Sequence, residues 1–301
     1  MAAARRILGV LLLGACVALA LPPIAQGQDV SATLNEGKPD LRIVGPYSTK
    51  ALIYAVEHSL KQSKGLEVNG MVGLSNAEAL ASLAQGSCDL ALRSAPLTGE
   101  ERASYPDLEL VAVPVGMEVV SLGVSTDVWE SGVHSVTQEN MRAIYEQKLT
   151  NWKTLGGPDE KITLFNFEQG DGIWEIFASW LYGDNRRAPF PKVQSVANSG
   201  DARADLEFTA GAIVPMGAAY VDGTRCHGLG ISQSGGVAYP VAADVAASKY
   251  PAVRPIIAVV IGRPTLAIRA ATEYLTSPAG QAVVRQSGAF GLEACPKPDD
   301  E

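Results

Sequence analysis

The sequence predicts an α/β fold in which mainly parallel sheets are flanked by helices. Short apolar runs rich in Val, Ile and Leu alternate with segments of helical spacing, and this alternation is typical of βαβ units. The alternation continues along the chain without a clear linker. A chain of 301 residues is long enough for two lobes of ordinary domain size. We therefore expect two α/β lobes joined by crossing strands.

The expected elements follow in chain order. Strands are expected at 41–46, 66–73, 89–92, 108–125, 161–167, 211–216 and 254–262, and helices at 49–62, 76–85, 137–148, 172–181, 264–274 and 277–288. Pro114 and Gly116 interrupt the long β-rich run. In open α/β sheets a ligand binds beyond the carboxyl ends of the strands, next to helix N-termini. The candidate binding turns are therefore GPYST, VGLSN, LRSAPLT and FEQGDG.

Composition and charge exclude several classes of function. The chain is 47% hydrophobic, which predicts a buried core, and its formal charge of −8 argues against a nucleic-acid partner. His58, His134 and His227 are scattered without the spacing of metal ligands. No nucleophile elbow, HExxH or P-loop motif is present. We expect a monomeric protein that is not an enzyme and has no cofactor and no metal.

The N-terminal segment predicts export. Arg5 and Arg6 precede an apolar run at 7–21, and small residues around Gly27 offer a cleavage site, so residues 1–27 are interpreted as a signal peptide. The run is too short for a comfortable membrane span. A periplasmic location follows. The alternative is a lipoprotein attached through Cys16, because residues 13–16 (LGAC) resemble a lipobox, although the following residues stay apolar instead of forming a polar tether.

Three cysteines would remain in the exported chain. Cys88 lies in an apolar, strand-like run and is expected to be a buried thiol. Cys226 and Cys295 both lie in Gly- or Pro-flanked segments. Because disulfides persist outside the cytoplasm, a bridge between Cys226 and Cys295 is expected.

One phrase of the sequence resembles a known family. VTQENMRAIYEQKLTNWKTLGGPDEKIT, at 136–163, is similar to the "IYxGKITNWKxLGGPD" phrase of the phosphate-binding proteins of bacterial phosphate ABC transporters. LRIVGPYST, LASLAQGSCDLALRSAPLTGEE and YLTSPAGQAVVRQSGAFGL resemble further stretches of that family in the same order. The resemblance spans nearly the whole chain after the leader.

This resemblance implies a two-lobed type II periplasmic-binding-protein fold with hinge strands between the lobes. Lobe 1 would comprise residues 28–115 plus 226–301, and lobe 2 residues 116–225. Such a protein closes on a small-molecule ligand and delivers it to a membrane transporter, either an ABC permease or another kind of partner.

The resemblance also places candidate ligand residues in three turns. Tyr47, Ser48 and Thr49 bring three hydroxyl groups to the start of a helix. Ser75 and Asn76 follow the next expected strand, and Arg93 and Ser94 end the strand after that. For the hydroxyl and amide residues, capping of the helix that follows is an equally good explanation.

The fourth turn departs from the family pattern, which is an Arg, three residues and then Ser-Gly-Thr. Phe167 falls at the Arg position, and Asp171, Gly172 and Ile173 replace Ser-Gly-Thr. Asp171 is expected to cap the helix and to repel a phosphate dianion. With Trp174 these residues make the cleft aromatic and acidic, unless Ile173 and Trp174 pack inside the lobe.

We therefore expect an exported solute-binding protein whose ligand is not phosphate but an organic or amphipathic solute, held by stacking and a carboxylate. One alternative is a genuine phosphate-binding component, with the missing charge supplied by Arg93 or by Arg186 and Arg187. The other is a ligand-free docking or sensory partner of a membrane complex.

Overall fold

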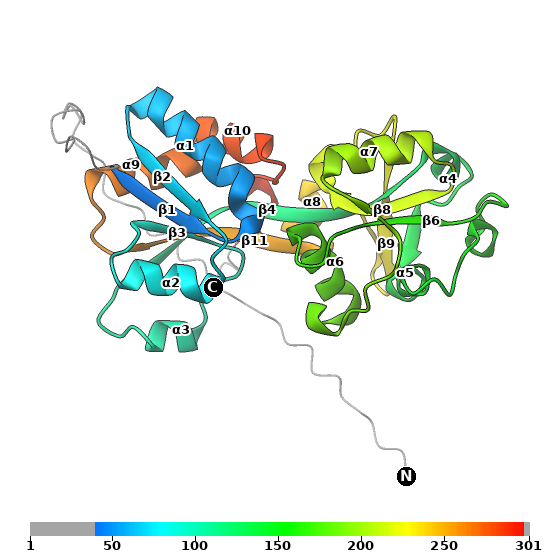
Figure 1. Ribbon diagram of the computed structural model, residues 1–301, viewed down its shortest axis with the longest axis horizontal. Helices are drawn as coiled ribbons and strands as arrows, with labels where there is room; N and C mark the ends of the chain where they lie inside the picture. The colour runs from blue at the N-terminus through cyan, green and yellow to red at the C-terminus, as the bar shows by residue number, and fades with distance from the viewer. Residues whose placement is uncertain (1–39, 298–301) are drawn as a thin grey trace, which may run out of the picture.

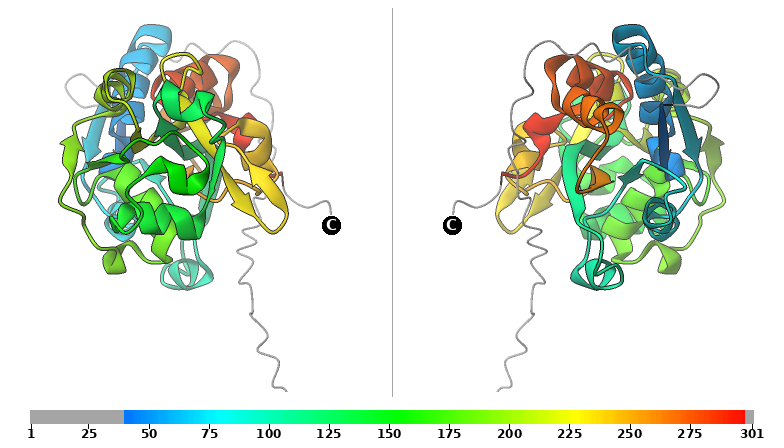
Figure 2. Two further views of the ribbon diagram at one scale, coloured as in Figure 1. Left: turned by 90° about the vertical axis from the view of Figure 1, so that its right-hand side faces the viewer. Right: turned by 90° about the vertical axis from the view of Figure 1, so that its left-hand side faces the viewer.

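The computed structural model describes residues 40–297, so the expected signal peptide and the alternative lipidation at Cys16 lie outside the described residues. Two lobes lie side by side along the long axis of the molecule and are joined by two crossing strands (Figure 1). Figure 2 shows each lobe from its own end. None of the helices within residues 40–297 is long and apolar enough to cross a membrane.

The first lobe is built on a sheet with the strand order β2-β1-β3-β11-β4. The strands are β1 (Leu41–Gly45), β2 (Val68–Val72), β3 (Leu90–Arg93), β4 (Leu110–Val124) and β11 (Val253–Ile261). β1, β2 and β3 are parallel, whereas β11 runs antiparallel to both β3 and β4. The helices are α1 (Lys50–Lys64), α2 (Asn76–Ala84), α3 (Gly99–Ala103), α9 (Leu266–Thr276) and α10 (Pro278–Gln286).

Alternation along the strands divides the core of the first lobe between the two faces of the sheet. Leu41 and Ile43 belong to the hydrophobic cluster under α1, α9 and α10, whereas Val44 belongs to the cluster under α2. Successive side chains of a strand point to opposite faces, so both faces must be apolar when helices cover both.

The second lobe continues the sheet in the order β4-β8-β6-β7, with β9 pairing with β4 and also with β5 and β10. The added strands are β5 (Ser135–Thr137), β6 (Thr163–Phe167), β7 (Gln194–Val196), β8 (Ala212–Gly217), β9 (His227–Gln233) and β10 (Gly236–Ala238). The helices are α4 (Thr126–Glu130), α5 (Gln138–Tyr145), α6 (Gly172–Tyr182), α7 (Ser199–Phe208) and α8 (Ala242–Ala246). Short 3-10 turns include η2 (Tyr47–Thr49), η3 (Trp152–Leu155), η5 (Ala218–Tyr220) and η6 (Leu292–Ala294).

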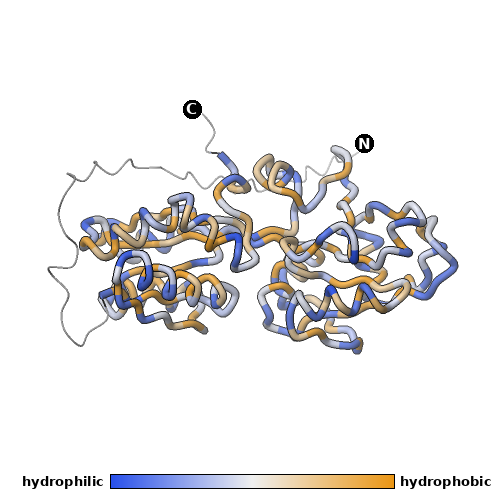
Figure 3. Tube along the Cα trace, turned by 90° about the horizontal axis from the view of Figure 1, so that it is seen from above, coloured by the Kyte–Doolittle hydropathy of each residue, from blue (hydrophilic) through white to orange (hydrophobic). Residues whose placement is uncertain are grey.

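β4 and β11 form the connection between the lobes. Over residues 110–119 β4 pairs with β11, and over residues 120–124 it pairs with β8 of the second lobe. The connecting chain is largely hydrophobic, as the orange tube at the centre of Figure 3 shows. One 15-residue strand therefore belongs to both lobes.

The chain returns to the first lobe later than the predicted residue 226. β9 pairs with β4 and β5, and Leu229, Val245 and Tyr250 pack in the main hydrophobic cluster of the second lobe. The glycine-rich segment at 228–236 (GLGISQSGG) lies in the β9–β10 hairpin. The return runs along β11.

The TNWKTLGG phrase anchors the turn before β6. The side chain of Trp152 is fully buried, and its Nε1 donates a hydrogen bond to Gly211 O at 2.9 Å. Its role in the structure is packing within the second lobe, away from the cleft.

The predicted bridge between Cys226 and Cys295 is not formed. Cys226 is a buried free thiol whose Sγ donates to Tyr220 O at 3.8 Å. It packs in the cluster around Phe165, whereas Cys295 packs against a different cluster of the same lobe. Cys88 is buried as expected, and burial raises its pKa to about 11.

Candidate ligand site between the lobes

A cavity of about 240 Å³ takes its walls from both lobes. Ser48 and Thr49 of η2 line it from the first lobe, Asp171 and Ile173 from the second, and Glu118 of β4 from the connecting strands. A larger hollow of about 480 Å³ is lined by residues of the second lobe alone, among them Tyr145 and Pro191. We take the cavity between the lobes as the candidate site because type II folds close on their ligand there.

The lobes touch on two sides of this cavity. A Cβ on Gly172 would lie 2.8 Å from Ser48 Cβ, which is closer than real Cβ contacts come. On the other side, a Cβ on Gly288 would lie 3.2 Å from a ring carbon of Tyr220. Glycine at position 172 therefore permits η2 and α6 to approach each other closely.

Asp171 caps α6, as the sequence predicts. Its Oδ1 accepts a hydrogen bond from Ile173 N at 2.8 Å. Burial raises the pKa of Asp171, and the nearby Glu175 carboxylate adds to that rise, although the backbone hydrogen bonds and Arg254 oppose it. The carboxyl group of Asp171, at the start of α6, therefore binds a proton at a higher pH than an exposed aspartate does.

Arg254 does not line the cavity itself but places a positive charge beside Glu118, which does. It lies on β11 opposite Glu118 of β4 in the strand ladder. Its Nε donates to Glu118 Oε2 at 2.8 Å, and its Nη1 donates to Glu175 Oε2 at 3.0 Å. Burial lowers the pKa of Arg254, but the two carboxylates outweigh burial and raise it. The guanidinium therefore stays charged although its side chain is only 16% exposed.

Two buried donors at this point have no hydrogen-bond partner within residues 40–297. They are Arg254 Nη2 and Ser48 Oγ, and a Cβ on Gly172 would lie 3.1 Å from that Nη2. A buried polar group without a partner destabilises the protein by roughly 1–3 kcal/mol, and native proteins keep few of them. Ser48 lines the cavity, and Arg254 bonds to Glu118, which lines it as well. An oxyanion provides acceptors for unpartnered donors of this kind.

Arg254 was missed by the sequence analysis. It opens a run interpreted only as a strand, RPIIAVVIG, and a charged residue at the start of an apolar strand was its one local signal. Its partners Glu118 and Glu175 lie 136 and 79 residues away in the chain.

Of the other two predicted residues of the first turn, Thr49 lines the cavity and Tyr47 does not. Thr49 is buried and lines the cavity, and its Oγ1 donates to Pro46 O at 2.9 Å. Tyr47 is 69% exposed, and its ring lies against Gly73.

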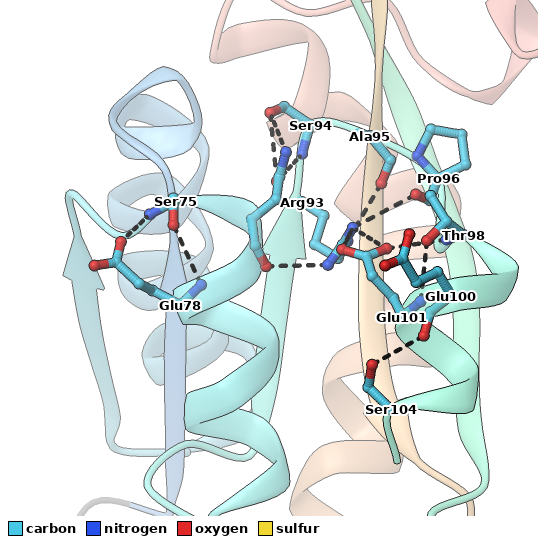
Figure 4. A network of polar contacts seen from close by, with 11 residues as sticks. Ser75, Glu78, Arg93, Ser94, Ala95, Pro96, Thr98, Glu100, Glu101 and Ser104 are labelled. Carbon is cyan, nitrogen blue, oxygen red and sulfur yellow. Dashed lines mark hydrogen bonds and ion pairs between the residues drawn. The ribbon is translucent and has the colours of Figure 1, made fainter. Parts of the chain in front are cut away.

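The second and third turns bond to each other and do not line the cavity. Ser75 caps α2 in a capping box with Glu78 (Figure 4). Asn76 Oδ1 accepts from Ser94 N at 2.9 Å, and its Nδ2 donates to Ser94 Oγ at 3.3 Å. These three residues therefore shape the ends of β2 and β3.

Arg93 does not face the cavity. Its Nη2 donates to the Glu101 carboxylate at 2.8 Å and its Nη1 to Asn76 O at 3.0 Å (Figure 4). The side chain is 1% exposed, so it is a buried structural cation. Arg186 and Arg187 are exposed and pair with Asp184. None of the three replaces the missing arginine of the fourth turn.

The expected aromatic cleft is corrected in part. Trp174 is 3% exposed, and its Nε1 donates to Tyr145 OH at 2.8 Å inside the second lobe. Phe167 contributes to the cavity wall but packs in the same hydrophobic cluster as Trp174. Ile173 lines the cavity. Stacking on Phe167 and Trp174 is therefore not available to a ligand.

The chain is similar in sequence to proteins of the PBP superfamily. The model of the PBP superfamily domain matches residues 39–278. The phosphate-binding protein PstS of Borreliella burgdorferi is 26% identical over 170 residues, which cover 54% of this chain and 61% of that protein. The PstS protein of Bacillus subtilis is 25% identical over 212 residues, covering 70% of this chain and 66% of that protein. The matched parts thus span less than two thirds of either relative.

The fold is shared with solved structures. An ABC-type phosphate transport receptor from Vibrio cholerae superposes with a TM-score of 0.64 at 19% identity, covering 83% of this chain and 99% of that one. At this identity the likeness establishes the two-lobed fold.

Proposed function

Because this chain belongs to the PBP superfamily, we propose that it is a solute-binding protein that captures phosphate in the cavity between its lobes. The relatives are named as binding proteins and not as enzymes. The organic, non-phosphate ligand that the sequence favoured is not supported by these relatives, whereas the alternative of a phosphate-binding component agrees with their names.

The observation that carries this proposal is the pair of unpartnered donors beside Gly172. Arg254 Nη2 and Ser48 Oγ are both buried. The expectation against phosphate depended on the lack of a cation at position 167 and on the acidic cap at 171. Arg254 brings a guanidinium to the same helix N-terminus from a different strand.

The site binds an oxyanion through charge-assisted hydrogen bonds. A phosphate oxygen accepts from Arg254 Nη2 and from Ser48 Oγ, and the phosphate lies near the positive end of α6. Hydrogen bonds to charged groups contribute about 1.5–3 kcal/mol each. Asp171 opposes this attraction and favours a ligand of lower negative charge.

Capture is coupled to the arrangement of the lobes. Ser48 belongs to the first lobe and Gly172 to the second, so a ligand held by Ser48 and Arg254 at the start of α6 favours the closed form. The closed protein then presents its ligand to an ABC permease outside the cytoplasmic membrane. This handover and this location are part of the proposal.

The test is isothermal titration of phosphate into phosphate-stripped protein, with Arg254→Gln, Ser48→Ala and Arg186→Gln compared with the wild type. We expect roughly 100-fold weaker binding for Arg254→Gln and about tenfold weaker binding for Ser48→Ala. Arg186 is exposed and pairs with Asp184, so its variant controls for general loss of charge and is expected to bind like the wild type.

Thermal unfolding shows whether each variant is folded. Ser48→Ala keeps the Cβ that contacts Gly172, so it reports on the hydroxyl alone. Failure of the wild type to bind phosphate, or equal affinity in all four proteins, contradicts the proposal. Absence of any binding would favour a ligand-free docking protein.

A further inference from the structure

We propose that Glu175 is an internal counter-anion that occupies Arg254 while the cavity is empty and leaves it when the oxyanion binds. The inference rests on the proposed function and concerns what sets the affinity of that site. The geometry of three side chains carries it.

Two of the three guanidinium nitrogens of Arg254 already donate hydrogen bonds to carboxylates. Nε donates to Glu118 at 2.8 Å and Nη1 donates to Glu175 at 3.0 Å, which leaves Nη2 as the nitrogen without a partner within residues 40–297. An arginine holds an oxyanion best through two parallel hydrogen bonds. The end of the guanidinium formed by Nη1 and Nη2 offers such a pair, and one of these two nitrogens, Nη1, already donates to Glu175.

The two carboxylates that contact Arg254 differ in how exposed they are to solvent. Glu118 faces Arg254 across the antiparallel β4–β11 ladder, and its side chain is 17% exposed. Glu175 lies in the first turn of α6, and its side chain is 38% exposed. Glu175 can therefore rotate towards solvent, whereas Glu118 stays beside the guanidinium. The exchange involves Nη1 and leaves the bond from Nε in place.

The charges around the cavity give the exchange a direction. Asp171, Glu118 and Glu175 surround a single arginine, and the charges of Glu175 and Arg254 act on Asp171. An oxyanion that bound without displacing Glu175 would add charge to an acidic cluster. Replacement of Glu175 at Nη1 keeps the number of anions touching Arg254 unchanged.

This contact stabilises the empty protein and not the complex. A contact present in the ligand-free state alone lowers the apparent affinity, because the ligand must displace it. Removal of the contact should therefore strengthen phosphate binding and weaken the empty protein. Removal of an ion pair with a purely structural role would destabilise the empty protein and the complex equally.

The test compares Glu175→Gln with Glu168→Gln. Glu168 is exposed and lies just before α6, so its variant removes one nearby negative charge without touching Arg254. In phosphate titrations we expect Glu175→Gln to bind about 10- to 100-fold more tightly than the wild type, as for loss of one competing charge-assisted hydrogen bond. Glu168→Gln is expected to remain within about twofold of the wild type.

Thermal unfolding adds a second readout. Without phosphate, Glu175→Gln is expected to unfold at a lower temperature than Glu168→Gln, and in saturating phosphate this difference is expected to disappear, because the contact is absent from the complex. Equal affinities for the two variants overturn the inference while phosphate binding by the wild type stands. No binding by any of the three proteins overturns the proposed function and this inference together.

Discussion

Asp171→Asn separates the two roles of the residue that begins α6. Asparagine caps a helix as well as aspartate does, so the hydrogen bond from Ile173 N, 2.8 Å long here, is retained. The substitution removes one negative charge. For an anion about one helical turn away, roughly 5 Å, two unit charges at an effective dielectric constant near 20 repel by about 3 kcal/mol. Phosphate affinity is therefore expected to rise, by about 100-fold at most.

The pH dependence makes this expectation specific. Burial raises the pKa of Asp171, so the wild-type carboxyl group becomes protonated as the pH falls through that raised value. The ratio of the two affinities, variant over wild type, is expected to be largest at high pH and to approach one in mild acid. Taking the ratio cancels the titration of phosphate itself.

The stability of the protein is expected to depend on the ionisation of Asp171 in the same direction as the phosphate affinity does. A carboxyl group with a raised pKa contributes stability below its ordinary pKa, near 3.8, and loses it as the pH rises through the folded value. The variant is therefore expected to unfold at a higher temperature than the wild type at neutral pH, with the difference vanishing near about pH 4. Weaker phosphate binding by the variant would refute this reasoning and indicate that Asp171 accepts a hydrogen bond from the ligand. An affinity ratio that does not change with pH would refute it as well.

Two further substitutions test the contact between the lobes and the structural role of Arg93. Gly172→Ala places a Cβ 2.8 Å from Ser48 Cβ, and such overpacking costs about 1–3 kcal/mol. Titration should therefore show phosphate binding about 5- to 150-fold weaker, with little change in the unfolding temperature. Unaltered affinity would mean that the lobes do not need this contact. Arg93→Met breaks the buried pair with Glu101 and is expected to lower the free energy of unfolding by about 3–5 kcal/mol in urea, without changing the phosphate affinity of the folded protein. The opposite pattern, lost affinity at full stability, would show that Arg93 reaches the ligand.

Local features of the fold could be predicted from the sequence. Asp171 was recognised as a cap because it precedes an apolar helix, and caps depend on neighbouring residues alone. The aromatic cleft was wrong for a reason that was also local. Trp174 lies on the stripe completed by Phe177, Ala178 and Leu181, which are all buried, and this spacing is that of the inner face of a helix.

Long-range features could not be predicted in the same way. The role of Arg254 depends on strand pairing with Glu118 and on the position of Glu175, and neither follows from the residues around position 254. Arg93 shows the converse. It lies in a family motif next to candidate ligand residues, yet its partner Glu101, eight positions later, directs it away from the cavity.

The position of β11 within the first lobe has a consequence for how the chain folds. β11 lies between β3 and β4 in the sheet, although it begins 160 residues after the end of β3 (253 − 93), more than half of the length of the chain. During synthesis, β3 therefore emerges long before the strand that covers its edge. An uncovered edge can pair with another chain, and contacts between distant segments form slowly. The nascent protein thus passes through a period in which its first lobe is vulnerable to aggregation, and this period ends only when β11, at 253–261, has been synthesised.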